Sequence, residues 1–548
     1  MQRQFSSIRW AALASAAALV VGMLVSVLVP SASAGVAAPA KAAAADGWTG
    51  TWSVSPVSGG PSYNQQTLRQ IVHTSIGGTS ARVRLSNVFG SKPLVVADVH
   101  IAQSGSGSTV STGTDRAVTF GGATSVTVPV GGTAVSDSVG FAVTALSNVA
   151  VSVYLPQSTG PVTFHPQGTQ TNYLASGDVS GSATLSGAAT TGSYSVLTNL
   201  DVQNPAAEGA VVTLGASITD GVASSQGSNR RWPNDLAVRL SGAGRTIGVL
   251  NQGISGNNLL ADASGQSALN RFSRDVLGQP GVRWVIFSDD PINDLGSGNP
   301  PSSDQLIAGL KQLISSAHQN GVGFLCSTLT PFQGSGGWSQ NGETSRAAID
   351  SFIRSSASGC DGVIDQDAAT HDPADPTRYL PAYDSGDHLH PNEAGLQAIA
   401  DTVNLNLFGT ASTPPPAAPV VSLRSHANGL YVAADTAGLS PLIADSGTIG
   451  TAEEFDELDQ GNGLIALRAH ADGEYVTAEK AGASPLIDNR AAVGLWETFQ
   501  LVHNADGSVT LKAQVNNDYV TAENAGAAPL IANRTAIGGW EEFDLVTD

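Results

Sequence analysis

The residues best suited to chemistry are a serine, a histidine and an aspartate that lie far apart along the chain. Ser217 follows the apolar, β-branched run 211–214 and stands between Gly215 and Gly221. Such a run predicts a buried strand, and the glycines predict a tight turn that holds the hydroxyl out of the packed sheet. A serine hydroxyl becomes a good nucleophile only when a base takes its proton. Gly-x-Ser turns are common in chains rich in glycine and serine, so this turn alone does not establish catalysis.

A base and an orienting acid come from one short segment. Asp387 and His390 are three residues apart, close enough for the carboxylate to hold one imidazole nitrogen while the other faces the serine. His388 is the alternative base, but it points elsewhere on the turn if Asp387 is the partner. The simplest structural explanation is that Asp387 caps the helix that follows, because aspartate is common before a helix start.

Two further segments could donate hydrogen bonds to a developing oxyanion. Segment 251–257 follows the predicted strand 247–250, and its glycines let a backbone N–H approach a ligand closely. Asn293 follows the predicted strand 284–287, and its amide can donate a hydrogen bond. Each block alone has an ordinary structural explanation. Four blocks in this order, after successive elements, favour a serine hydrolase.

The elements that would position these residues alternate between strand and helix from about residue 205 to residue 410. This order predicts a parallel sheet with helices on both faces. Ligands of such a sheet bind beyond the carboxyl ends of its strands, where Ser217 lies. The predicted strands are 211–214, 247–250, 284–287, 322–325 and 362–364, and the predicted helices are 232–240, 269–276 and 306–317.

Taken together, the blocks resemble the SGNH, or GDSL-type, hydrolase superfamily over residues 205–410. The resemblance implies a flavodoxin-like, three-layer α/β domain that works without cofactor or metal. It implies that Ser217 is the nucleophile, His390 the base and Asp387 the acid. It also implies three donors to an oxyanion hole, which are the N–H groups of Ser217 and Gly256 and the side-chain amide of Asn293.

Two positions depart from the pattern of that superfamily. Gly-Asp-Ser is replaced by Gly215-Ala216-Ser217, and the glycine common before the oxyanion asparagine is replaced by Pro291. The first change removes a carboxylate beside the nucleophile, and we expect it to alter how the turn is held. Proline fixes φ and removes a donor, so we expect the Asn293 loop to be reshaped. Both changes bear on the level of activity more than on the reaction class.

Residues 47–204 carry a different pattern, in which short runs of alternating polarity, such as 81–88 and 149–155, are separated by glycine, serine, asparagine and proline. Period-two runs at short intervals predict an antiparallel β-sandwich of jelly-roll type. This region looks like the sandwich that precedes the hydrolase domain in a group of secreted actinobacterial esterases. Its histidines are expected to be structural, as most histidines in strands are; they are His73, His100 and His165.

The C-terminal region 420–548 is a threefold repeat. Tyr431, Tyr475 and Tyr519 recur at an interval of 44 residues. Three β-rich repeats without a helix pattern predict units that close around a pseudo-threefold axis. The order Tyr-Val, Pro-Leu-Ile, Trp-Glu-x-Phe resembles the fascin-like β-trefoil modules of secreted actinobacterial carbohydrate-active enzymes. The resemblance implies a binding module with polysaccharide as its candidate ligand, although core and turn roles explain the repeated residues more simply.

The charge balance and the N-terminus bear on partners and location. The chain has 548 residues, 25 of them basic and 45 acidic, without a basic block, which argues against nucleic acid and anionic membranes as partners. Residues 1–34 combine two arginines, an apolar run and Ala32-Ser33-Ala34, which is typical of a secretory signal. An uncleaved membrane anchor is the alternative. We expect a secreted, extracellular monomer that acts on an ester substrate and has no membrane span after cleavage.

Two segments of low core-forming composition connect these parts, an alanine-rich leader at 35–46 and a proline-rich linker at 411–419. The two cysteines, Cys326 and Cys360, lie beside predicted strands of one domain. In an oxidising compartment they could pair, but two buried free thiols fit nearly as well. So few soft ligands argue against a metal site.

Two functions remain open from the sequence. The first is an exported hydrolase of acetyl or short acyl esters, on polysaccharide or on lipid, that works through an acyl-enzyme on Ser217. The second is a polysaccharide-binding secreted protein whose hydrolase domain is weak or inactive, as the replacements at Ala216 and Pro291 suggest. The complete set of blocks favours the enzyme.

Overall fold

The computed structural model describes most of the chain, namely residues 47–409, 419–434, 440–461, 463–471, 473–490 and 493–547. The expected signal 1–34, the leader 35–46 and the linker 411–419, apart from its last residue, lie outside this part. The described residues include no helix that is long and apolar enough to cross a membrane. They belong to one compact unit.

A five-stranded parallel sheet carries the predicted site. In chain order its strands are β15 (Gly209–Gly215), β16 (Ile247–Gly253), β17 (Val282–Phe287), β18 (Gly323–Ser327) and β19 (Gly362–Ile364). They lie in the order β16-β15-β17-β18-β19, so the direction of strand addition reverses beside β15. All five predicted strands are present. Their near-continuous apolar runs are buried on both faces, as a covered parallel sheet requires.

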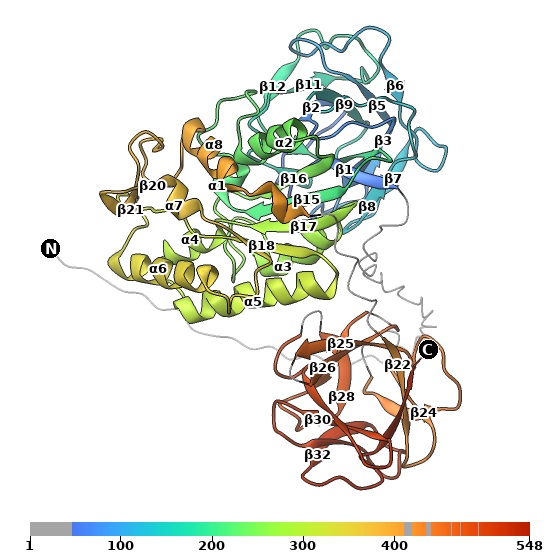
Figure 1. Cartoon of the computed structure of the whole chain (residues 1–548). Helices are drawn as coiled ribbons and strands as arrows, with labels where there is room; N and C mark the ends of the chain where they lie inside the picture. The colour runs from blue at the N-terminus through green and yellow to red at the C-terminus, as the bar shows by residue number, and fades with distance from the viewer. Residues whose placement is uncertain are drawn as a thin grey trace, which may run out of the picture. The chain divides into compact units, whose positions relative to one another are not determined.

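Helices cover both faces of this sheet (Figure 1). They are α1 (Ser217–Asp220), α2 (Trp232–Gly242), α3 (Ala268–Phe272), α4 (Asp290–Leu295), α5 (Ser303–Gln319), α6 (Gln340–Arg354), α7 (Gln366–Thr370) and α8 (Glu393–Thr402). Helix α2 packs against α8, and α5 packs against α6. The three predicted helices are present, but a π-helical turn, Ser273–Leu277, continues α3, so the second of them changes its hydrogen-bond pattern midway.

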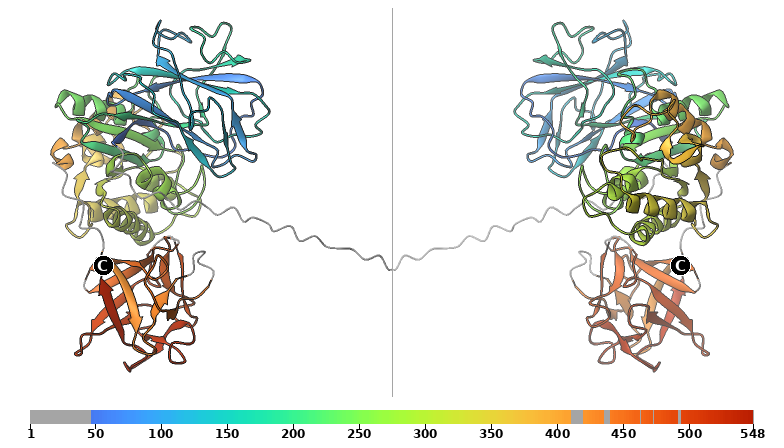
Figure 2. Two further views of the ribbon diagram at one scale, coloured as in Figure 1. Left: turned by 90° about the vertical axis from the view of Figure 1, so that its right-hand side faces the viewer. Right: turned by 90° about the vertical axis from the view of Figure 1, so that its left-hand side faces the viewer.

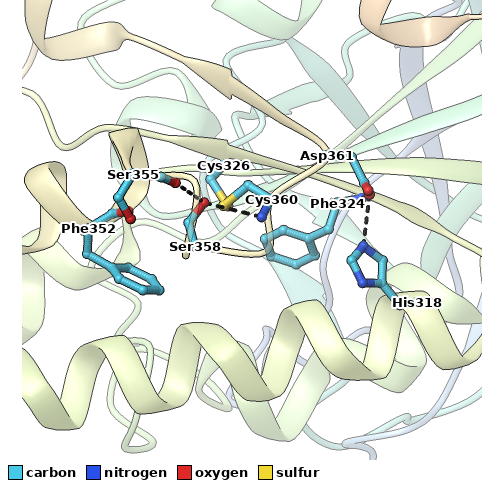
Figure 3. Close-up of a disulfide and its surroundings, with 8 residues drawn as sticks. All are labelled: His318, Phe324, Cys326, Phe352, Ser355, Ser358, Cys360 and Asp361. Atoms are coloured by element: carbon cyan, nitrogen blue, oxygen red, sulfur yellow. Dashed lines mark hydrogen bonds and ion pairs between the residues drawn. A yellow bond between two sulfur atoms is a disulfide. The ribbon is translucent and has the colours of Figure 1, made fainter. Parts of the chain in front are cut away.

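The two cysteines form a disulfide beside the sheet (Figure 3). Cys326 in β18 is bonded to Cys360 just before β19, with the two Cα atoms 5.8 Å apart. Next to it, an Asp361 carboxylate oxygen lies 2.9 Å from His318 Nε2 and accepts the Phe324 N–H at 2.6 Å. The thiols that the sequence left unassigned are therefore paired, and the bond ties two neighbouring parallel strands together.

Residues 47–204 form two main antiparallel sheets. The strands of this region are β1 (Trp48–Ser53), β2 (Gln66–His73), β3 (Ser80–Ser86), β4 (Leu94–Val96), β5 (Asp98–Gln103), β6 (Arg116–Ala117), β7 (Val126–Val128), β8 (Thr133–Val135), β9 (Asn148–Leu155), β10 (Phe164–His165), β11 (Asn172–Ser176), β12 (Ala189–Thr191), β13 (Tyr194–Ser195) and β14 (Leu197–Gln203). One sheet has the order β1-β14-β3-β8 and the other β12-β11-β2-β9-β5-β6. Val83 and Leu200 of the first sheet share one core with Leu68 and Val151 of the second.

The N-terminal sheets pack directly on the parallel sheet. The Gly50 N–H of β1 donates to Pro280 O at 2.9 Å. A Cβ on Gly248 of β16 would lie 2.1 Å from Gly50 O, so the two backbones approach as closely as only glycine allows. The Val249 N–H of β16 donates to Ser75 Oγ at 2.9 Å. These contacts join the two sheet systems closely, two of them between backbone atoms and one through the Ser75 hydroxyl.

Residues 420–547 contain a closed sheet of six strands. The strands of this region are β22 (Val420–Ser425), β23 (Tyr431–Ala433), β24 (Ile443–Ser446), β25 (Phe455–Gly461), β26 (Leu464–Ala469), β27 (Tyr475–Ala478), β28 (Leu486–Arg490), β29 (Phe499–His503), β30 (Val509–Ala513), β31 (Tyr519–Ala522), β32 (Leu530–Arg534) and β33 (Phe543–Thr547). Antiparallel pairing runs from β22 through β25, β26, β29, β30 and β33 back to β22. Each repeat adds one hairpin, β23–β24, β27–β28 or β31–β32.

The repeated aromatic residues of this region have different surroundings. Phe455, Phe499 and Phe543 are fully buried and fill its core. Tyr475 is 6% exposed, whereas Tyr431 and Tyr519 are half-buried. The repeated phenylalanines therefore serve to pack the core of this region. Figure 2 shows its strands, coloured orange to red, from two sides.

Candidate active site

Ser217, His390 and Asp387 lie within hydrogen-bonding distance of one another. Ser217 Oγ is 2.8 Å from His390 Nε2, and His390 Nδ1 is 2.6 Å from Asp387 Oδ2. The two imidazole nitrogens have different partners, which orients the ring and sets its tautomer. This arrangement allows the ring to take the proton of the serine hydroxyl while the carboxylate stabilises the resulting imidazolium.

The turn that presents Ser217 is held by a carboxylate from the end of β17. Asp289 Oδ1 accepts the Ala216 N–H at 3.0 Å, and its Oδ2 accepts the Ile218 N–H at 2.7 Å. A Cβ on Gly215 would lie 2.4 Å from Asp289 Oδ1, so this position requires glycine. The turn therefore has a bracing carboxylate even though residue 216 is a fully buried alanine. Nothing in the spacing of Asp289 pointed to this role.

Asn293 lies on the short helix α4, at the carboxyl side of β17. The predicted loop is a helix here, and Pro291 occupies its first turn, where a missing N–H costs no intrahelical bond. One N–H of the Asn293 amide donates to Asn257 O at 2.9 Å. The amide has two N–H groups, so a second one remains to donate to a ligand.

Gly256 lies in the loop that follows β16, with a φ of +78°. A Cβ there would lie 2.7 Å from Ser264 Oγ, so both its conformation and its surroundings favour glycine. Within residues 47–409, the N–H groups of Ser217 and Gly256 make no hydrogen bond to the protein. Since Asn293 donates to the residue that follows Gly256, the loop after β16 and the helix after β17 are linked. The predicted oxyanion donors thus follow three adjacent strands, around the point where the strand order reverses.

Asp387 is strongly acidic. Partial burial opposes its ionisation, but hydrogen bonds from the His390 ring, the His390 N–H and the Leu389 N–H outweigh burial and hold its pKa at about 2. The two N–H bonds to Oδ1 are 2.8 and 2.9 Å long. Asp387 is therefore a carboxylate at neutral pH and can orient the imidazole of His390.

The two alternatives for this segment are not what the structure contains. His388, the alternative base, has a φ of +64° and pairs through Nδ1 with Asp384. The helix cap is Asn392, whose side chain accepts the Ala394 and Gly395 N–H groups of α8. Asp387 is thus not needed as a cap.

A fully buried arginine forms hydrogen bonds with the carboxyl ends of β15 and β16 and with the loop after β16. Arg271 on α3 donates to Gly215 O at 3.0 Å, to Gln252 O at 2.6 Å and to Asn257 Oδ1 at 3.0 Å. Asp290 lies 3.3 Å from the same guanidinium, and burial raises its pKa to about 7 although Arg271 opposes the rise. The sequence did not indicate this role, because a single arginine on a predicted helix is typical of a solvated surface.

One group of side chains in the described ranges could hold a metal ion. His426, Asp506 and Glu542 each offer a ligand atom, and these atoms lie within 4.8 Å of one another. The group is in the C-terminal region and is largely exposed. The chemistry of the serine, histidine and aspartate does not draw on it.

Comparison with known families identifies the class of this domain. Residues 213–398 match the GDSL-like Lipase/Acylhydrolase family. The chain therefore contains a GDSL-like lipase/acylhydrolase domain, and this places it among the carboxylic ester hydrolases. Comparison with curated proteins gives no match.

Several solved structures resemble parts of the chain. A mutant acetyl-xylooligosaccharide esterase from Geobacillus is 21% identical, with a TM-score of 0.30 over 37% of this chain and 95% of that one. A GDSL-like lipase from Bacteroides thetaiotaomicron is 16% identical, with a TM-score of 0.27 over 36% and 88%. ThreeFoil, a designed 3-fold symmetric protein, is 22% identical, with a TM-score of 0.22 over 23% and 97%. Similarities this low carry no conclusion about substrate.

Proposed function

We propose that the chain is a secreted serine esterase that hydrolyses acetyl or short acyl carboxylic esters through an acyl-enzyme on Ser217. The observation that carries the proposal is the hydrogen-bonded series Ser217–His390–Asp387 within a GDSL-like domain. The ionised Asp387 and the serine turn braced by Asp289 support it, because both prepare the groups before a substrate arrives.

In the first half of the reaction, Ser217 Oγ attacks the carbonyl carbon while His390 Nε2 takes its proton. Asp387 holds the other ring nitrogen and stabilises the imidazolium. The tetrahedral oxyanion receives hydrogen bonds from the N–H groups of Ser217 and Gly256 and from the Asn293 amide. Collapse of this intermediate expels the alcohol, which takes its proton from His390. In the second half, His390 deprotonates a water molecule that attacks the acyl carbon. The second tetrahedral intermediate collapses by breaking the bond to Ser217 Oγ, which takes its proton back from His390 as the acid leaves.

We further propose that the C-terminal repeats form a β-trefoil that binds polysaccharide, and that the N-terminal sheets form a β-sandwich. The ring of six strands with one hairpin per repeat supports the first assignment, and the shared core of two antiparallel sheets supports the second. A binding module localises an enzyme without defining its chemistry. Acetyl groups on polysaccharide are therefore the first substrates to test, with short acyl lipids as the second.

The composition of residues 1–34 supports export, and we propose that the exported protein is an extracellular monomer.

The test is ester hydrolysis by the exported protein over a panel of p-nitrophenyl esters of increasing acyl length and of acetylated glycans. Ser217→Ala should lower kcat by roughly 10⁴-fold or more, as removal of a serine nucleophile does elsewhere. Ser224→Ala, a hydroxyl removed a few residues away, serves as the matched control. Equal rates for the wild type and Ser217→Ala would contradict the proposal. Retained binding to insoluble polysaccharide without turnover of any ester would favour an inactive domain.

A further inference from the structure

One buried histidine of the N-terminal sheets reaches the helix that begins at Ser217. His165, the last residue of β10, is only 2% exposed. Its Nδ1 lies 2.9 Å from Ser55 O, and its Nε2 lies 3.1 Å from Asp220 Oδ1 and 3.2 Å from Gln167 O. Asp220 is the last residue of the four-residue helix α1 and is 1% exposed. The contact therefore crosses from the N-terminal sheets to the turn that presents the nucleophile.

The partners of His165 indicate its charge. Two carbonyl oxygens and a carboxylate surround the ring, and carbonyl oxygens have no proton to donate, so both ring nitrogens act as donors. Burial is the largest effect and opposes this charge, but the Asp220 carboxylate and the hydrogen bond to Ser55 O together outweigh burial and raise the pKa of His165, against a smaller opposing effect of the Arg231 guanidinium. His165 and Asp220 thus form an ion pair shielded from water.

Asp220 also forms hydrogen bonds with the loop that carries Gly256. Its Oδ2 accepts both the N–H of Ser255, at 3.0 Å, and the hydroxyl of Ser255, at 2.6 Å. A Cβ on Gly253 would lie 2.3 Å from Asp220 N, so the start of the loop lies directly against α1. One carboxylate therefore joins the nucleophile helix to the residue that precedes a proposed oxyanion donor.

We infer that the N-terminal sheets are part of the catalytic machinery and that His165 is a positioning residue. Through Asp220 it sets the position of the Gly256 N–H relative to Ser217. Donors to an oxyanion act only when they are held where the charge develops, and misplacement by about 1 Å can cost about 100-fold in rate. The hydrogen bonds of His165 go to Ser55, Gln167 and Asp220. Because the Gly256 N–H acts on the oxyanion of the transition state, its displacement should lower kcat rather than raise KM.

A second contact from the same N-terminal segment acts in the same direction. The Ser55 carbonyl holds His165, and the Ser55 hydroxyl accepts a hydrogen bond from Arg271 Nη1 at 2.9 Å. Arg271 in turn donates to Gly215 O, before the nucleophile, and to Asn257 Oδ1, after Gly256. Ser55 thus contacts both buried supports of the site, His165 and Arg271.

The test rests on the proposed esterase activity and compares kcat and KM of the full-length exported protein with those of variants. His165→Gln and Asp220→Asn should each lower kcat by about 10- to 100-fold and leave KM within about twofold. The double variant should lose no more than the worse single one, because both changes break one contact. His100→Gln is the matched control. His100 also stands between two carboxylates, Asp115 at 2.7 Å and Asp98 at 3.2 Å, but in the N-terminal sheets alone.

The outcomes separate this inference from the proposed function. A folded His165→Gln protein with the kcat of the wild type overturns the inference while the esterase proposal stands. If His165→Gln does not fold, Asp220→Asn and Ser255→Ala decide, and unchanged kcat in both overturns it. A loss in His100→Gln as large as that in His165→Gln also overturns it, since the effect would then be general. A wild type without ester turnover contradicts the proposed function, and the inference falls with it.

Discussion

Two histidine–aspartate pairs contact the serine turn and the short helix that it begins, and they differ in sequence separation and in burial. His390 and Asp387 are three residues apart, and their side chains are 14% and 50% exposed. His165 and Asp220 are 55 residues apart and 2% and 1% exposed. The first pair can exchange protons with a substrate and with water. The second is closed to solvent, and all of its hydrogen bonds end on the protein.

The difference in burial suits one histidine–aspartate pair to proton transfer and the other to positioning. The histidine of a catalytic pair must gain and lose a proton during each turnover, so substrate and water need access to it. A buried pair is costly to disturb, because removing one partner leaves a charge without compensation. The partly exposed pair His390–Asp387, the outer pair, is therefore suited to proton transfer. The buried pair His165–Asp220, the inner pair, is suited to holding the oxyanion donors in position. The predictions below test that division.

The largest effect is expected at the outer pair. His390→Ala should lower kcat by roughly 10⁴-fold or more, because the serine then has no base. His388→Ala, two residues earlier, should keep kcat within about tenfold, since His388 pairs with Asp384 and not with Ser217. Steady-state kinetics on one p-nitrophenyl ester measures both. Similar losses in the two variants would mean that the segment, rather than His390, is what matters.

The disulfide should affect stability without affecting the site. Replacing Cys326 and Cys360 by serine opens a loop with a sequence separation of 34 and should lower the free energy of unfolding by about 2–4 kcal/mol. Because neither sulfur contacts either histidine pair, kcat at 25 °C should change by less than about twofold. Urea unfolding and kinetics on the same samples give the two numbers, and a large loss of kcat would contradict the separation.

The bracing carboxylate should affect both stability and activity. Asp289→Ala leaves the buried Ala216 and Ile218 N–H groups without their acceptor, at a cost of about 2–4 kcal/mol in the free energy of unfolding. It should also lower kcat, because the turn that presents Ser217 loses its support. Asp304→Ala, an exposed carboxylate in the first turn of α5, is the control and should cost well under 1 kcal/mol. Equal stability of the two variants would argue against the bracing role.

The inner pair should leave a signature in the pH dependence of stability. Burial and, more weakly, Arg231 lower the folded-state pKa of His165, but Asp220 and the Ser55 carbonyl together raise it above its ordinary value of 6.5. Its stabilising contribution is therefore complete below about pH 6.5 and is lost as the pH rises through the folded-state value. The stability difference between the wild type and His165→Gln should shrink in that range, as urea unfolding at pH 5.5–9.5 would measure. A difference that grows with pH would contradict the imidazolium assignment.

The parts of this molecule that could be predicted are those with local signals. The apolar runs of the parallel strands, the Gly-x-Ser turn and the short spacing from Asp387 to His390 are readable because the responsible residues are neighbours in the chain. Helix α6 was not predicted, since Ile349 and Ile353 are among the few buried apolar residues on its face. The sequence predicts a loop where α4 lies, because a proline indicates a helix breaker unless it falls in the first turn.

The supports of the site had no such signal. Asp289, Asp220 and Arg271 are single charged residues whose partners come from other elements, so only the folded chain gives them a role. His165 was expected to be structural, and its burial agrees with that expectation. What the sequence could not indicate is which element it reaches, because Ser55, His165 and Asp220 meet only when two sheet systems pack together.

The central claim is that Ser217, activated by His390, forms a covalent intermediate with an acyl group. The most direct measurement is peptide mapping by mass spectrometry after reaction with a fluorophosphonate, which modifies activated serines. The account predicts one adduct, on the peptide that contains Ser217, absent in Ser217→Ala and formed far more slowly in His390→Ala. An intact wild-type protein that gains no adduct, or gains it on another residue, would contradict the account.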